Sequence, residues 1–320
     1  MYPLKFQPIL KERLWGGSKL KEVLGKPIEN SITGESWELS TVKGDVSEIA
    51  NGELSGTSLQ ELIDENPEAL LGKSVVARFG TDFPILIKFI DAKKDLSIQL
   101  HPNDELAKER HDSFGKTEMW YIMDADQDAN LIVGFNKDVK KEEYSASLKN
   151  DTLLDLLNYE SVKEGDTFFI NTGKIHAIGA GVLLAEIQQT SDVTYRVFDF
   201  NRKDKNGNLR ELHTELALDA IDYEKKDDFK VSYPKEKDTV NTMVECPYFK
   251  TNFLELSQEL TQDVSKRDSF TIYMCVGGSV EVENDFGAAY IEKGETVLIP
   301  SNCNTIRLKS TEAKLLEVTI

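Results

Sequence analysis

The chain has 320 residues, of which 40% are hydrophobic and 29% charged, a composition typical of a globular protein with one large domain or two ordinary ones. Its formal net charge of −18 disfavours nucleic acid and anionic membranes as partners, because so acidic a surface repels both. No stretch approaches the roughly 20 apolar residues of a membrane span, and the first residues lack the pattern of a signal peptide, so we expect a cytoplasmic protein.

The first clear element along the chain is a helix. Ser58-Leu59-Gln60-Glu61 has the spacing of a capping box, and Gly72 marks the predicted helix end. Most of the chain beyond Gly72 consists of short apolar or alternating runs separated by turn residues, which favours a sandwich or jelly roll. The predicted strands are 85–91, 96–100, 119–123, 131–135, 166–171, 182–189 and 194–200.

Helices interrupt this pattern in two places. Apolar residues at helical spacing predict a short helical insert around 138–160, broken at Asn150-Asp151, and two helical turns at 214–221. The Lys- and Asp-rich segment 223–240 is interpreted as a solvated connection.

Beyond this connection the strand pattern resumes at 248–256, 269–276, 279–283 and 295–300. The segment 165–170 resembles 294–299, which suggests two copies of one fold. We therefore predict a mainly β protein with two similar jelly-roll domains, 1–235 and 243–320, the insert around 138–160 belonging to the first.

Four histidines and three cysteines restrict the possible chemistry. Cys246, Cys275 and Cys303 are far apart and form no Cys-x-x-Cys pair, which argues against a disulfide frame or a thiolate metal site. Gln99 and His101 are two apart on a predicted strand, so both side chains point to one face. A polar strand face turned to solvent is the commoner reason for such a pair.

Three further motifs carry candidate site residues. In 165–176 a strand ends at the Gly173 turn and His176 opens the next strand, although an ordinary hairpin has the same form. Lys116 and Glu118 share a face just before another strand, where a surface ion pair is the simpler explanation. Asp192 precedes Arg196 by four residues in a possible surface hairpin.

Together these motifs resemble the type I mannose-6-phosphate isomerases of the cupin superfamily, in their shorter bacterial form. Residues 165–176 match the second cupin motif, with Asn171 where proline is usual. The resemblance is specific over residues 1 to about 222 and weaker beyond. Other agreeing segments are Leu14-Trp15-Gly16-Gly17, Gly34-Glu35-Ser36-Trp37-Glu38, 83–91 and Tyr195-Arg196-Val197-Phe198-Asp199.

The resemblance implies an aldose–ketose isomerase that interconverts mannose 6-phosphate and fructose 6-phosphate through a cis-enediol. It implies one Zn²⁺ per chain, with the ligands Gln99, His101, Glu118 and His176. A set of imidazole, amide and carboxylate groups without cysteine agrees with a catalytic zinc site. The C-terminal domain carries no such set, since Thr305 stands where a ligand histidine would be.

By the same resemblance, Arg196 is a catalytic residue, and its guanidinium suits a phosphate or a developing oxyanion. Lys116 is the other cation expected at the site, and a neighbouring metal ion would lower its pKa and make it a proton carrier. Asp192 is a further acid–base candidate. The substrate would be a phosphorylated hexose, and the chain would be a monomer or a dimer.

Some residues keep two interpretations at this stage. Trp15 and Lys19 either border the pocket, or Trp15 belongs to the core and Lys19 to the surface. Glu186 is a candidate for orienting the site. His111 and His213 lie outside the motifs and are expected to be structural or surface residues. Two other functions compete with the isomerase: another cupin metalloenzyme, and a non-catalytic sugar-binding cupin.

Overall fold

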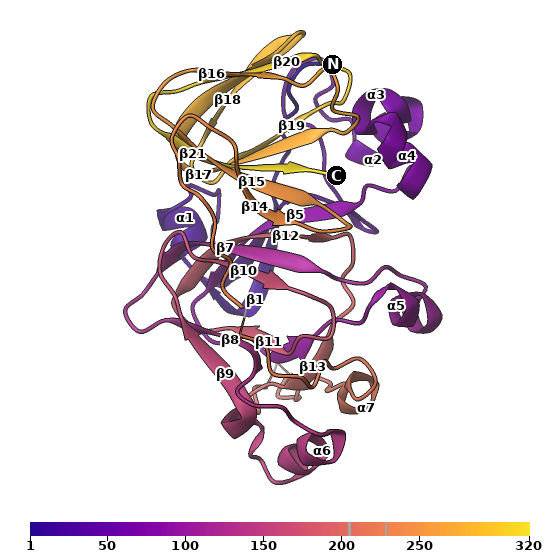
Figure 1. The fold of residues 1–320 in the computed structure, drawn as a ribbon, viewed down its shortest axis with the longest axis vertical. Coiled ribbons are helices and arrows are strands. Elements are labelled where there is room, and N and C mark those ends of the chain that lie inside the picture. The colour runs from indigo at the N-terminus through magenta and orange to yellow at the C-terminus, as the bar shows by residue number, and fades with distance from the viewer. Residues whose placement is uncertain (204–205, 228) are drawn as a thin grey trace.

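The computed structural model describes residues 1–203, 206–227 and 229–320. They form sheets of six, five and eight strands and a two-stranded ribbon of β3 (Thr41–Val42) and β4 (Asp45–Val46). The eight-stranded sheet occupies one end of the long axis and the five-stranded sheet lies toward the other, with most helices along one side (Figure 1). The prediction of a mainly β fold with few helices is confirmed.

The six-stranded sheet is antiparallel throughout. Its two central strands, β5 and β12, are buried along their whole length, because apolar clusters cover both faces. In spatial order the strands are β1 (Ile9–Gly17), β2 (Thr33–Leu39), β5 (Ile85–Ala92), β12 (Val182–Gln189), β7 (Glu118–Ala125) and β10 (Thr167–Ile170).

The five-stranded sheet faces the six-stranded one. One buried cluster contains Ile90 and Leu184 from the first sheet and Leu131 and Ile178 from the second, so the two sheets pack as a sandwich. The strand order is β13 (Tyr195–Phe198), β6 (Ile98–Leu100), β11 (His176–Ile178), β8 (Asn130–Phe135) and β9 (Leu157–Ser161).

The eight-stranded sheet contains only strands after residue 240. Phe83 and Phe270 stack with ring centroids 4.9 Å apart, in a core that this sheet shares with the six-stranded sheet. Its main path is β14 (Asn241–Glu245), β15 (Lys250–Leu256), β21 (Ala313–Thr319), β17 (Thr271–Asn284), β20 (Thr305–Lys309) and β16 (Leu260–Asp263), and β18 (Gly287–Glu292) and β19 (Thr296–Ile299) pair with β17.

The helices are short. Ser58 and Glu61 form the predicted capping box, but Pro67 divides the segment before Gly72 into two helices. The helices are α1 (Lys19–Glu22), α2 (Leu59–Glu65), α3 (Pro67–Leu71), α4 (Lys73–Phe79), α5 (Asp104–His111), α6 (Lys141–Lys149), a 3-10 turn η1 (Leu153–Leu156) and α7 (Thr214–Ala217). Among the described residues, none of these helices has the length and apolar character to cross a membrane.

Three local predictions were wrong in part. The helical insert ends at Lys149, and its second half becomes η1 and strand β9, because leucines at 153, 154, 156 and 157 fit a helix and a strand equally well. Of the two helical turns predicted at 214–221, only Thr214–Ala217 is helical. The connection 223–240 is not wholly solvated, since Phe229 is buried and Val231 N–H donates to the Thr167 carbonyl; its Asp228 lies outside the described residues.

The similarity between 165–170 and 294–299 extends to neighbouring strands. Lys88, Glu186 and Trp120 are directly paired neighbours across β5, β12 and β7, and Asn252, Glu317 and Tyr273 are paired in the same way across β15, β21 and β17. In each row a buried carboxylate accepts hydrogen bonds from both flanking side chains. The two sheets therefore share side-chain chemistry as well as strand order.

Candidate functional site

Two imidazoles and a carboxylate meet between the six- and five-stranded sheets. His101 follows β6, Glu118 begins β7 and His176 begins β11. One potential ligand atom from each of the three side chains lies within 4.8 Å of the other two, and none of the three residues is more than 1% exposed. The fold thus brings together three residues that are distant in sequence, and within the described residues they are the one such group of His, Cys, Asp or Glu side chains.

Gln99 lies beside this group. It pairs with His176 across the β6–β11 ladder, and the two side-chain Nε2 atoms are 3.5 Å apart. A half-turn of the amide exchanges its nitrogen and oxygen, which directs Oε1 toward the same point. All four predicted ligands are therefore neighbours.

The histidines present lone pairs to the centre. The Nδ1 of His101 lies 2.9 Å from the Val193 carbonyl oxygen, and that of His176 lies 2.8 Å from the Lys174 carbonyl oxygen. Since a carbonyl only accepts, each Nδ1 carries a proton and each Nε2 presents a lone pair, which in His101 faces the Lys116 ammonium. Burial lowers the pKa of His176 to about 3 and that of His101 well below its ordinary value, so both rings are neutral.

Glu118 has one free and one paired oxygen. Its Oε1 is fully buried and has no hydrogen-bond partner among the described residues, whereas its Oε2 accepts a 2.5 Å hydrogen bond from the Lys116 ammonium. Burial raises the pKa of Glu118 to about 7. Lys116 Nζ is also 3.1 Å from His101 Nε2, so a positive charge already sits beside the donor atoms. The unpartnered oxygen and the two lone pairs fit a divalent cation.

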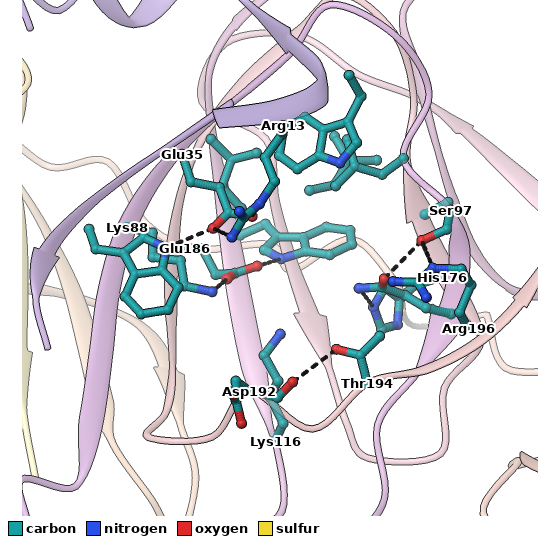
Figure 2. A pocket seen from close by; sticks show the side chains of 18 of the residues that line it. Arg13, Glu35, Lys88, Ser97, Lys116, His176, Glu186, Asp192, Thr194 and Arg196 are labelled. Atoms are coloured by element: carbon teal, nitrogen blue, oxygen red, sulfur yellow. Dashed lines mark hydrogen bonds and ion pairs between the residues drawn. The ribbon is translucent and has the colours of Figure 1, made fainter. Parts of the chain in front are cut away.

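A cavity of about 330 Å³ opens beside this centre. Cationic side chains outnumber acidic ones in its wall, although the whole chain carries a net charge of −18. Figure 2 shows side chains from both sheets converging on this space. The charged lining residues are Arg13, Lys88, Lys116, Arg196, Arg210, Glu35, Glu186 and Asp192.

Glu186 connects one wall to the predicted metal ligands. Lys88 Nζ donates to its Oε1 at 3.1 Å and Trp120 Nε1 to its Oε2 at 2.9 Å, while the Trp120 ring packs edge-on against His176. Burial alone would raise the pKa of Glu186, but Lys88 and Lys116 lower it to about 2, so the carboxylate stays charged. This position fits the orienting role predicted for it.

A second carboxylate in this wall went unrecognised in the sequence. Glu35 accepts hydrogen bonds from Arg13 Nε and Nη2 at 2.9 and 3.0 Å and from Trp37 Nε1 at 2.7 Å. The segment 34–38 belongs to the resemblance, but nothing in one sequence shows that the Arg13 side chain of β1 reaches Glu35 of β2.

Arg196 lies across the cavity from Glu35 and Lys88 (Figure 2), and Asp192 also lines the cavity. Arg196 pairs with Gln99 across the β13–β6 ladder; its Nε donates to Ser97 Oγ at 3.3 Å and its Nη1 to the Glu211 carbonyl at 3.0 Å. Burial and the neighbouring Arg210 lower the pKa of Arg196. Asp192 is exposed and lines the cavity, so all three predicted catalytic residues reach it.

A second arginine at this wall is held by a buried acid. Asp199 is 5% exposed, and its carboxylate accepts hydrogen bonds from the guanidinium groups of Arg202 and Arg210. Although burial alone would raise the pKa of Asp199, these two arginines lower it. Two guanidinium groups share one carboxylate, so positive charge remains at the cavity edge. Asp199 ends a segment that carries the family resemblance, whereas no motif in the sequence marks Arg210.

The remaining candidates divide between the site and the scaffold. Trp15 is buried and lines the cavity, whereas Lys19 pairs with Asp124 and Asp126 outside it. His213 Nδ1 accepts the Arg196 backbone N–H at 3.1 Å, which makes His213 a support for that strand. His111 Nε2 lies 2.9 Å from the Tyr195 hydroxyl, away from the cavity.

Known proteins resemble this chain over nearly its whole length. Residues 3–130 match a profile described as "Phosphomannose isomerase type I, catalytic domain", and residues 239–320 match "Mannose-6-phosphate isomerase, cupin domain". The mannose-6-phosphate isomerase ManA of Bacillus subtilis is 35% identical over 96% of each chain, and a mannose-6-phosphate isomerase of Streptococcus mutans is 33% identical over 95% of this chain and 93% of that protein. A crystal structure of the mannose 6-phosphate isomerase from Bacillus subtilis aligns with a TM-score of 0.91 at 32% identity and covers 100% of both chains.

Proposed function

The chain belongs to the type I phosphomannose isomerase family, and we propose that the cavity beside His101, Glu118 and His176 is where it interconverts mannose 6-phosphate and fructose 6-phosphate. It is an aldose–ketose isomerase, because its relatives are named mannose-6-phosphate isomerases. The observation that supports this cavity is the buried, neutral pair of imidazoles around an unpartnered carboxylate oxygen.

The residues that would hold the metal are Gln99, His101, Glu118 and His176. We propose Zn²⁺, because two imidazoles and one carboxylate without a thiolate are typical of catalytic zinc sites, and the Gln99 amide would add a neutral oxygen ligand. A bound zinc ion would act as a Lewis acid toward the sugar oxygens and favour the charge that develops on them. One anionic ligand leaves the loaded site with net positive charge.

The protein's own side chains would move the protons. The reaction takes a proton from C2 of the aldose; that electron pair forms the C1–C2 double bond while the C1 carbonyl π bond breaks and O1 takes up a proton. In the second half O2 loses its proton, the C2 carbonyl forms, and the electrons of the double bond take a proton at C1. Asp192 supplies a carboxylate at the cavity surface that can accept a proton, and Lys116 supplies a buried ammonium that can donate one. Running the reaction in D₂O with Asp192→Asn and Lys116→Met variants identifies which of them handles the carbon-bound proton, because loss of that base suppresses deuterium uptake at carbon.

Arg196 and Arg210 would bind the phosphate. Both line the same wall, and Asp199 holds Arg210 in place. Guanidinium groups bind phosphate oxygens with paired donors, and the local positive charge offsets the repulsion expected from a chain of net charge −18. Arg196 would also stabilise the developing oxyanion.

Asp199→Asn tests this anchor. The amide cannot neutralise Arg202 and Arg210, so Arg210 should leave its position, and we expect KM for mannose 6-phosphate to rise about 10-fold while kcat changes less than about 3-fold. Steady-state kinetics of the variant measure both values. A variant with unchanged KM would contradict this placement of the phosphate.

We further propose that residues 1–235 form the catalytic unit and 243–320 a metal-free cupin unit, with function in the cytoplasm. The profile match at 239–320 supports the division into two units, and the described residues contain no second candidate metal group. The free thiols of all three cysteines support the cytoplasm, which is a reducing compartment.

The direct test of the function is coupled turnover of mannose 6-phosphate before and after treatment with a chelator. We expect activity in the zinc-loaded protein, a loss of at least about 100-fold after chelation, and recovery when zinc is returned. A zinc-loaded protein without turnover would refute the proposed reaction.

A further inference from the structure

Asp104 holds the segment that carries Lys116 and Glu118. It is the first residue of α5 and is half-buried. Its Oδ1 accepts hydrogen bonds from the Gly115 backbone N–H at 2.8 Å and from Gln189 Nε2 at 3.0 Å. A single carboxylate oxygen therefore bridges the start of α5, the approach to β7 and the end of β12.

Gln189 extends this contact to the next residue. Its Oε1 accepts the Thr117 backbone N–H at 2.8 Å, and its own backbone N–H donates to the Thr117 carbonyl at 3.1 Å. Gly115 and Thr117 are thus fixed on both sides of Lys116, and Glu118 follows directly. His101 is tied to the same unit, since it lies three residues before Asp104 on the continuous chain.

The contact at Gly115 leaves no room for a side chain. A Cβ there would lie 2.8 Å from the Asp104 nitrogen and 2.9 Å from its Oδ1. Any larger residue would have to push the start of α5 away from the segment before β7.

The eight-stranded sheet contributes the other half of the contact. Tyr248, in the turn between β14 and β15, donates its hydroxyl to Asp104 Oδ2 at 2.6 Å. Arg78 donates to the Pro247 carbonyl and fixes the same turn. Although burial alone would raise the pKa of Asp104, the hydrogen bonds from Tyr248, Gly115 and Gln189 lower it, so the carboxylate remains charged.

We propose that Asp104 and Tyr248 are positioning residues for the isomerase centre, through which a turn of the C-terminal sheet fixes Lys116 and Glu118 in place. This inference rests on the proposed function of the cavity. Neither residue touches the substrate space; they act through the backbone at 115–117. The phosphate wall at Arg196 and Arg210 is not part of this contact, so chemistry and metal binding should suffer more than substrate affinity.

The mildest test is Tyr248→Phe, which removes one hydroxyl. We expect kcat to fall about 3- to 10-fold with KM within about 2-fold, and the affinity of the metal-free protein for Zn²⁺, measured against a chromophoric chelator, to fall about 3-fold or more. Asp104→Ala should lower kcat and Zn²⁺ affinity about 10- to 100-fold, and Gly115→Ala should lower both in the same direction.

Tyr233→Phe is the matched control. Tyr233 also donates its hydroxyl to a carbonyl of the six-stranded part, that of Gly165 at 2.7 Å, but beyond the end of β10 remote from Glu118. We expect its kcat and Zn²⁺ affinity to stay within about 2-fold of the parent. If Tyr248→Phe and Asp104→Ala behave like this control, the inference is wrong. If the parent protein binds Zn²⁺ but does not isomerise the sugar, the proposed function fails, and the Zn²⁺ affinities still decide whether Asp104 and Tyr248 position the centre.

Discussion

Glu118→Gln should lower kcat for mannose 6-phosphate by about 1000-fold or more and weaken Zn²⁺ binding by at least about 100-fold. The substitution keeps the size of the side chain but removes the only anionic ligand among the four proposed. It also leaves the buried Lys116 ammonium without its carboxylate partner. The Zn²⁺ ion and this ammonium would then lie close together with no negative charge between them. Coupled turnover and chelator competition measure the two effects.

Glu317→Gln provides the matched control for this experiment. Glu317 is also fully buried, but it lies in the eight-stranded sheet and accepts hydrogen bonds from three side chains. We expect it to lower the melting temperature while kcat per folded molecule and Zn²⁺ affinity stay near those of the parent. If Glu118→Gln retains Zn²⁺ affinity within about 3-fold, Glu118 is not a metal ligand.

Lys116→Met should lower kcat by about 100- to 10,000-fold and yet leave Zn²⁺ binding unchanged or tighter. The loss of kcat follows from removal of the proposed proton donor. The effect on the metal has the opposite sign from that of Glu118→Gln, because the substitution removes a positive charge 3.1 Å from His101 Nε2 and frees Glu118 Oε2. Measuring kcat and Zn²⁺ affinity on the same preparations separates the two roles.

Lys26→Met controls for the loss of a buried lysine. Lys26 pairs with Glu38 at 2.7 Å, with both side chains nearly inaccessible, and it does not line the substrate cavity. Breaking that pair should cost about 3–5 kcal/mol of folding free energy and leave kcat per folded molecule unchanged. A Lys116→Met protein that keeps full kcat would remove Lys116 from the proposed mechanism.

The sequence was most informative where local pattern and side-chain chemistry coincide. Gln99 and His101 were expected on one strand face, and His176 after a glycine turn; strand alternation fixes such directions without knowledge of the fold. That His101, Glu118 and His176 lie within 4.8 Å of one another follows only when strands β6, β7 and β11 are placed, and there the family resemblance supplied what spacing alone did not.

Residues that act through cross-strand partners were not predictable. Arg13 meets Glu35, and Arg210 meets Asp199, only after the sheets form, and each looks like an ordinary surface charge in the sequence. Asp104 shows the same limit, since its partners Gly115, Gln189 and Tyr248 come from three distant segments. Short leucine-rich stretches such as 153–157 remained ambiguous because tertiary packing decides between helix and strand there.

Two equivalent rows of side chains separate structural roles from catalytic ones in this fold. They are Lys88, Glu186 and Trp120 in the six-stranded sheet and Asn252, Glu317 and Tyr273 in the eight-stranded sheet. Glu317 accepts the same kind of hydrogen bonds as Glu186, although it has no candidate metal ligands around it among the described residues. A buried carboxylate at this position therefore has a structural role in both sheets. Earlier on the same strands, β7 and β17, Glu118 and Thr271 face equivalent isoleucines, Ile170 and Ile299, across the ladder. Thr271 thus corresponds to Glu118, and Thr305 follows Gly294 at the same spacing as His176 follows Gly165. Placing a carboxylate at Thr271 and an imidazole at Thr305 is therefore the natural first step toward building a metal site in the eight-stranded sheet.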